Sequence, residues 1–149
     1  MITASITGVT GLGMTFTIAM GGFDLSVGSL QVLTAIVVAS LLSVVDPPVA
    51  VLGALMVGVV IGLLNGVLIS KLQLPAFVVT FGMMSIVRGI ALLGTQGQSV
   101  MITRHVEFGL LNNSKVFGLP VPFIIMIVVF VMLSVLFKHT PFGRHACAV

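Results

Sequence analysis

Charged side chains are scarce in this sequence. Only 6% of the 149 residues are Asp, Glu, Lys or Arg, whereas soluble domains carry about a quarter. Hydrophobic residues make up 58% of the chain, and the mean hydropathy is +1.34. Several apolar runs approach or exceed the roughly 18 to 20 residues that span a bilayer. The sequence therefore predicts an all-α, polytopic membrane protein and excludes an ordinary soluble domain.

Acidic residues are the rarest of the charged residues, with three in the whole chain: Asp24, Asp46 and Glu107. The sequence has no paired carboxylates, no nucleophile with an adjacent base and no GxxxxGK[ST] phosphate loop. This inventory is too poor to build an active site. It also lacks the series of acidic residues and histidines that a proton relay inside a membrane needs. We therefore expect no enzyme, no catalytic residue and no cofactor, and a transporter of this kind would take its energy from a partner.

The chain is also poor in the residues that bind metals and nucleic acids. Its single cysteine, Cys147, excludes an internal disulfide and a multi-cysteine metal site. His105 and Glu107 would diverge on a helix and have no third ligand nearby, so we expect ordinary solvated polarity there and no metal site. The six basic residues lie singly, without an aromatic-containing cluster, which argues against a nucleic-acid partner. Without a basic n-region, no cleavable signal peptide is expected.

Apolar segments dominate what remains. Five of them are predicted to be transmembrane helices, at about 2–20, 25–45, 49–70, 76–94 and 121–138. Asp46, Pro47 and Pro48 predict the end of one span and the start of the next, because proline suits the first turn of a helix. The hydrophilic stretch 95–119 is too long for a tight turn and predicts a connection with a short surface or re-entrant element.

Orientation follows from the basic residues of the connections. Five spans place the two ends of the chain on opposite sides of the membrane. Lys71, Lys138 and Arg144 then share one side, and Arg104 and Lys115 share the other. The positive-inside rule makes the first side cytoplasmic and the 95–119 connection external.

A polar interruption, GGFDLSVGS at 21–29, separates the first two predicted spans. Paired glycines are poor helix formers and allow positive φ, so they predict a glycine-rich helix break after the first span. Asp24 is expected to be the N-cap of the second span. Breaks of this kind are where transporters place substrate sites, so we expect the interruption to shape a pathway through Gly21, Gly22, Asp24, Ser26, Gly28 and Ser29.

Two features inside the predicted spans leave alternatives open. Ala54, Gly58, Gly62 and Gly66 recur at four-residue spacing on one helix face, which favours static helix packing over a gating contact. Arg88 lies inside the fourth span, where an arginine costs a few kcal/mol and normally faces a partner, a cavity or the interface. The alternative is that its long side chain reaches the nearer interface and has no role in transport.

Three ordered motifs resemble one family, the permease subunits of ribose-type carbohydrate ABC importers. GGFDLSVGS at 21–29 resembles its G-G-[IF]-D-L-S-V-G-S signature, and LPAFVVTFGMMSIVRG at 74–89 resembles its L-P-x-F-[IV]-x-T-L-G-[MT]-x-x-[IV]-x-R-G segment. TPFGRH at 140–145 resembles the start of its cytoplasmic T-x-[FY]-G-R loop. The motifs cover nearly the whole chain.

The resemblance implies a function in a larger assembly. Two permease subunits, here a homodimer in the bacterial plasma (inner) membrane, would form the sugar pathway in the lipid bilayer. A periplasmic or extracellular sugar-binding protein would deliver the sugar, and cytoplasmic subunits would bind and hydrolyse the ATP. The cytoplasmic coupling helix would begin at 140–149 and use Thr140, Phe142, Gly143 and Arg144, and Arg88 would lie near the outer half of the pathway.

The sequence departs from the family pattern in length. Family members are roughly twice as long, so the resemblance implies that residues 1–149 form the N-terminal portion of a single transmembrane permease domain. Cys147 also stands where the family often has tyrosine. Two other readings stay open at this point: half of a secondary transporter with a broken-helix substrate site, and a non-functional fragment. The sequence shows no second break of the Gly-Gly-x-Asp kind that an inverted repeat would supply.

Overall fold

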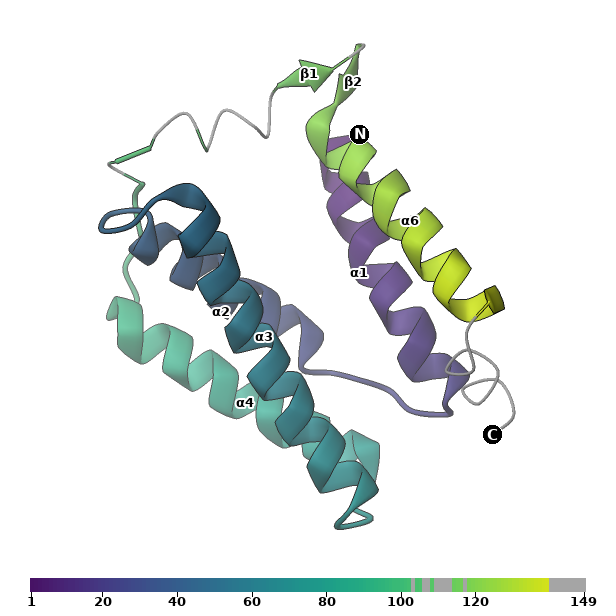
Figure 1. Ribbon diagram of the computed structural model, residues 1–149. Helices are drawn as coiled ribbons and strands as arrows, with labels where there is room; N and C mark the ends of the chain where they lie inside the picture. Colours follow the sequence, from purple (N-terminus) through teal and green to yellow (C-terminus); the bar gives the residue numbers. More distant parts are fainter. Residues whose placement is uncertain (103, 106–107, 109–113, 117, 140–149) are drawn as a thin grey trace. The chain divides into compact units, whose positions relative to one another are not determined.

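The computed structural model describes residues 1–102, 104–105, 108, 114–116 and 118–139. These residues form five α-helices and one hairpin (Figure 1): α1 (Ile2–Ala19), α2 (Val27–Leu41), α3 (Pro47–Ser70), α4 (Ala76–Thr95), β1 (Lys115–Val116), β2 (Leu119–Pro120) and α6 (Val121–His139). The helical membrane-protein class predicted from composition is confirmed. The chain divides into two compact units, Met1–Phe23 with Gly109–Val149, and Asp24–Phe108.

Four of these helices, α1, α3, α4 and α6, are long and apolar enough to cross a membrane. The exception is α2, whose 15 residues rise about 22 Å at 1.5 Å each, less than the roughly 30 Å hydrocarbon core. The predicted span 25–45 is therefore longer than the helix that forms. Its last residues turn instead, and the N–H groups of Val44 and Val45 both donate to the Leu41 carbonyl, at 2.9 and 2.8 Å.

The second unit packs α2, α3 and α4 around one apolar core. Leu33 of α2, Ile61 of α3, and Met83, Val87 and Ala91 of α4 form the buried cluster. The three α4 residues recur at four-residue spacing, so they lie on one face of the helix. This face leaves Arg88, next to Val87, outside the core.

The first unit is the pair α1 and α6, which lie side by side (Figure 1). The rings of Phe16 and Phe137 lie 4.1 Å apart between centroids, with an interplanar angle of 32°. At Gly8 the Met126 side chain of α6 packs so close to α1 that an added Cβ would lie 2.5 Å from its Sδ atom. The hydroxyls of α1 do not join the helices, because Thr7, Thr10 and Thr15 each donate to the carbonyl four residues earlier in the same helix.

Two helix boundaries are explained by their local chemistry. At the end of α1, Gly21 has φ of 73°, its N–H donates to Ile18 O at 2.9 Å, and Gly22 N–H donates to Thr17 O at 2.9 Å. This is a Schellman motif, which favours glycine at the left-handed position. At the start of α3, the extended Asp46 is the N-cap and Pro47 is the first helical residue, so the predicted restart at the two prolines is confirmed.

The long connection 95–119 is only partly among the described residues. It begins with a left-handed Gln96 and Gly97 (φ of 51° and 71°) that end α4. Near its other end, β1 and β2 pair antiparallel, with Lys115 opposite Pro120 and Val116 opposite Leu119. This hairpin leads directly into α6.

Candidate functional site

A cavity of about 630 Å³ opens along α2 and α4 in the second unit. One side is formed by the first turns and one face of α2, and the other by the C-terminal half of α4 and the residues that follow it. Its lining residues are Leu25, Gly28, Ser29, Val32, Ile36, Met84, Arg88, Ala91, Leu92, Thr95, Gly97, Gln98 and Ser99. The cavity therefore brings together two motifs that lie some sixty residues apart in the sequence, Gly28 and Ser29 of the first and Arg88 of the second.

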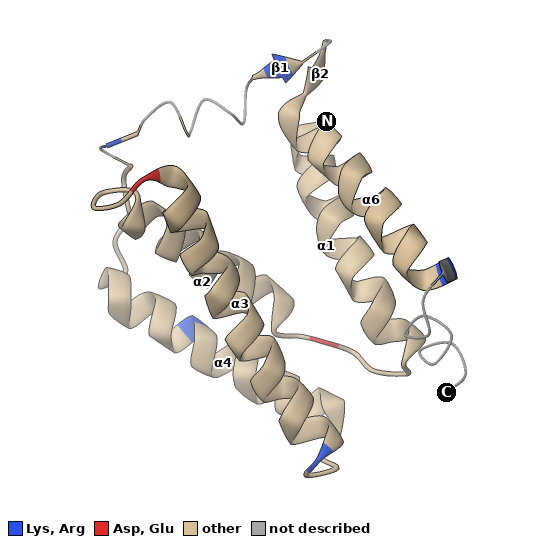
Figure 2. Cartoon of the chain, viewed as in Figure 1, with Lys and Arg blue, Asp and Glu red and all other residues tan. Residues whose placement is uncertain are grey.

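Arg88 supplies the positive charge of this cavity. It lies within α4, whereas most charged residues in Figure 2 lie at helix ends or in connections. Within the described part of the chain it forms no ion pair and no hydrogen bond, and its side chain is exposed. An intramembrane arginine normally has a partner or faces water. Of the two alternatives left open by the sequence, this geometry favours a cavity-facing guanidinium.

Hydroxyl and amide groups complete the polar lining. The Ser29 hydroxyl donates to Ser26 O at 2.8 Å, and the Thr95 hydroxyl donates to Ala91 O at 3.0 Å, so each keeps oxygen lone pairs for a ligand. Gln98 and Ser99 lie beyond the end of α4. Five donors of one guanidinium beside several hydroxyls suit a ligand that is rich in hydrogen-bond acceptors.

Directly before α2, a chain of hydrogen bonds fixes the start of the helix. Asn65 Nδ2 donates to Ser26 Oγ at 3.2 Å, and Ser26 Oγ donates to Asp24 Oδ1 at 2.6 Å. The Ser26 N–H also donates to Asp24 Oδ1, at 2.8 Å. Ser26 is fully buried and Asn65 is 5% exposed. The network joins the 21–29 motif to α3 and holds the α2 end of the cavity in place.

This network corrects the role expected for Asp24. The N-cap of α2 is Ser26, and Asp24 lies two residues earlier. The carboxylate accepts from the N–H two residues on, which is an Asx turn, so the helix begins later than the sequence predicts. Asp24 and Ser26 do not line the cavity.

Asn65 was missed by the sequence reasoning. It is a strongly polar side chain inside the apolar α3, and a polar residue at such a position signals a buried partner. Its Oδ1 atom is buried and accepts no hydrogen bond among the described residues. The direction of the Ser26–Asp24 bond fixes this orientation, because a carboxylate can only accept.

Of the other predicted site residues, those of the small-residue stripe do not line the cavity. Gly21 and Gly22 fall in the first unit, so the boundary between the units cuts the 21–29 motif after Phe23. Of the small-residue stripe, Ala54 is buried, whereas a Cβ added at Gly58, Gly62 or Gly66 would meet no atom within 4 Å. Their packing role stays a prediction. The proposed coupling residues, Thr140, Phe142, Gly143 and Arg144, lie outside the described residues.

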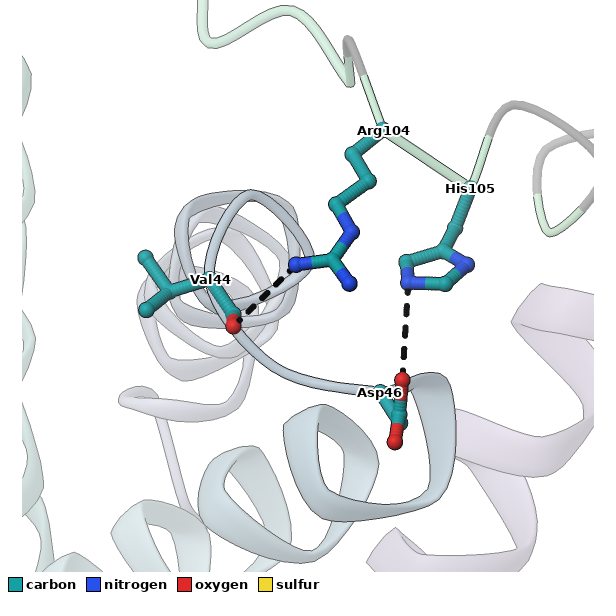
Figure 3. A network of polar contacts seen from close by, with 4 residues as sticks. All are labelled: Val44, Asp46, Arg104 and His105. Carbon is teal, nitrogen blue, oxygen red and sulfur yellow. Dashed lines mark hydrogen bonds and ion pairs between the residues drawn. The ribbon is translucent and has the colours of Figure 1, made fainter.

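A second polar cluster lies at the α2–α3 turn (Figure 3). Arg104 Nη1 donates to the Val44 carbonyl at 3.4 Å, and His105 Nε2 lies 3.8 Å from Asp46 Oδ1. His105 takes a left-handed backbone, with φ of 57°. These contacts put the segment after α4 and the α2–α3 turn at the same end of the second unit, as the predicted topology requires.

Comparison with known proteins identifies relatives along the whole chain. Residues 1–149 match a family described as "Branched-chain amino acid transport system / permease component". The chain is 38% identical over 147 residues to the ribose import permease protein RbsC of Bacillus subtilis, and 37% identical over 149 residues to RbsC of Escherichia coli K12. It is 35% identical over 152 residues to the D-allose transport system permease protein AlsC of E. coli K12.

These alignments cover 97% of this chain for the two ribose permeases and 99% for AlsC, and in each case 46% of the relative. The chain thus spans about half the length of the curated relatives it matches. No solved structure matches significantly. The relatives are bacterial permeases, and the described residues include four helices able to cross a membrane. The chain is therefore a multi-pass protein of the bacterial plasma membrane that belongs to the family described as "Branched-chain amino acid transport system / permease component".

Proposed function

We propose that this chain contributes to the membrane pathway of an ATP-driven sugar importer and that the α2–α4 cavity lines that pathway. The observation that carries the proposal is the meeting of Ser29 and Arg88 in one cavity. Relatives named for ribose, arabinose and allose support a pentose or hexose as the solute. Sugars offer many hydroxyl acceptors and donors, which match the guanidinium and hydroxyl lining.

The proposal assigns the energy source to other subunits. The three acidic residues of the chain include no pair that could bind and hydrolyse ATP. Cytoplasmic ATP-binding subunits would supply the hydrolysis and contact Thr140, Phe142, Gly143 and Arg144. A sugar-binding protein outside the membrane would deliver the solute, and a second permease subunit would complete the pathway.

The test is co-reconstitution in proteoliposomes with the ATP-binding subunits and the sugar-binding protein of a ribose import system. Sugar-loaded binding protein is expected to stimulate ATP hydrolysis and uptake of labelled ribose in the presence of the chain. Uptake driven by an ion gradient without the ATP-binding subunits would instead indicate a secondary transporter. Absence of any stimulation would contradict the proposal.

Variants at position 88 test the role of the cavity. Arg88→Gln is expected to lower sugar uptake about tenfold or more, because a hydrogen bond to a charged group contributes about 1.5 to 3 kcal/mol. Arg88→Lys keeps the charge but loses the planar fork, so an intermediate rate is expected. Arg104→Gln, outside the cavity, serves as the control. Equal rates of sugar uptake for Arg88→Gln, Arg88→Lys and Arg104→Gln would show that Arg88 has no role in the pathway.

A further inference from the structure

A second cavity, in the first unit, lies between α1 and α6 and has a volume of about 180 Å³. It is an open groove lined by leucine and phenylalanine side chains, with two hydroxyls and one amine. Its lining residues are Leu12, Thr15, Phe16, Phe130, Leu133, Ser134, Phe137 and Lys138. Space lined by such apolar side chains is poorly hydrated and takes hydrocarbon.

The polar groups of the groove are ordered along α6. Lys138 is exposed and ends the apolar stretch Val121–Lys138, so its amine lies at the level where a membrane helix meets the headgroups. Ser134, one turn earlier, is half-buried, and its hydroxyl has no hydrogen-bond partner among residues 1–102, 104–105, 108, 114–116 and 118–139. The groove is thus apolar inside, with a free hydroxyl and then a cation towards its end.

We propose that this groove binds one acyl chain of an anionic phospholipid, with the lipid phosphate at Lys138. The charge of Lys138 selects the anionic headgroup, since a basic side chain near an anionic membrane surface is stabilising. The Ser134 hydroxyl donates to an ester carbonyl of the lipid, and the tilted Phe16–Phe137 pair forms the wall against the acyl chain. The site is separate from the α2–α4 cavity and does not depend on the proposed sugar pathway.

Native mass spectrometry of the purified chain in detergent tests this directly. Phosphatidylglycerol and phosphatidylcholine with identical acyl chains are added in turn, and the lipid retained on the chain is counted. We expect one phosphatidylglycerol to be retained about fivefold more tightly than phosphatidylcholine, the ratio that corresponds to about 1 kcal/mol per basic side chain. Equal retention of the two lipids, or a second copy of the chain retained in place of lipid, would overturn the proposal.

Matched variants locate the site. Lys138→Gln is expected to abolish the preference for phosphatidylglycerol, and Lys138→Arg to keep it. Lys71→Gln removes an equal charge at the C-cap of α3 and is expected to have no effect. Ser134→Leu fills the groove and is expected to lower retention of both lipids, whereas Ser85→Leu, on the exposed face of α4, leaves it unchanged. Equal losses in the Lys138 and Lys71 variants, or full retention in Ser134→Leu, would exclude the groove.

Discussion

Asn65 carries two hydrogen-bonding groups into the interior of the second unit, and the described structure uses one of them. Its amide nitrogen donates to Ser26, which passes the interaction on to Asp24. Hydrogen bonds linked in this way polarise one another in a low-dielectric interior. Ser26 is therefore the central residue, because it is the only one of the three that both donates and accepts.

Replacing Ser26 is expected to destabilise the chain. Ser26→Ala leaves Asn65 Nδ2 without its acceptor and leaves the Asp24 carboxylate with the backbone N–H of residue 26 alone, and we expect a loss of about 1 to 2 kcal/mol in the free energy of unfolding. Denaturing detergent titration followed by circular dichroism measures it. Ser43→Ala, whose hydroxyl bonds only the nearby Ser40 carbonyl, is the control and is expected to change stability by less than about 0.5 kcal/mol.

A double-mutant cycle separates the network from ordinary packing. If Ser26 and Asn65 are coupled, Ser26→Ala with Asn65→Leu costs less than the sum of the two single variants, by about 0.5 kcal/mol or more. Strict additivity would show that the two residues act independently, and the network would then contribute nothing as a unit.

At the scale of elements, glycine has two different uses along α3. At Gly53 an added Cβ would lie 2.7 Å from Leu41 Cδ1, so the side chain of the last α2 residue packs against α3 at this glycine. At Gly62, two turns beyond the predicted stripe's first residue, an added Cβ meets nothing within 4 Å. The glycines of the stripe, Gly58, Gly62 and Gly66, are therefore not where α2 and α3 approach within the second unit.

The two glycines are expected to respond differently to the same substitution. Gly53→Leu overpacks the α2–α3 contact and is expected to cost about 1 to 3 kcal/mol of stability. Gly62→Leu meets open space and gains helix propensity, so stability is expected to stay level or rise by up to about 1 kcal/mol. Thermal unfolding of the two variants in the same detergent makes the comparison. A loss at Gly62 as large as that at Gly53 would mean that the stripe packs against something within the chain.

At the scale of the whole molecule, the contacts at the α2–α3 turn place this turn and the segment after α4 at the same end of the second unit. Because Arg104 reaches Val44, residues 44 and 104 lie at one end of the second unit, and α3 carries the chain to the other end. The topology predicted from basic residues makes the first end external.

Cysteine labelling tests this arrangement in membrane vesicles of known orientation. In a Cys147→Ser background, Val44→Cys is expected to react with a membrane-impermeant maleimide from outside, and Leu72→Cys only after the membrane is permeabilised. Both side chains are well exposed, at 72% and 61%. Labelling of both positions from the same side would rule out a membrane crossing by α3.

Much of this fold can be predicted from hydropathy and from the positions of proline residues. Hydropathy predicts the long helices, and the prolines after Asp46 mark the start of α3 correctly. The short α2 could not be predicted, because its limits depend on the Asx turn at Asp24 and on a partner 39 residues away. The position of Ser29 and Arg88 in one cavity could not be predicted either, since spacing along a sequence does not say which helix faces lie together.

The 15-residue α2 lies in the same bundle as the 24-residue α3. A bilayer that fits α3 is too thick for α2, and hydrophobic mismatch of this kind is relieved by local thinning or by tilting at a modest cost per ångström. The second unit thus favours a thinner bilayer beside α2 than beside α3. Acyl-chain length in the surrounding membrane therefore acts on the same helix that forms one wall of the cavity.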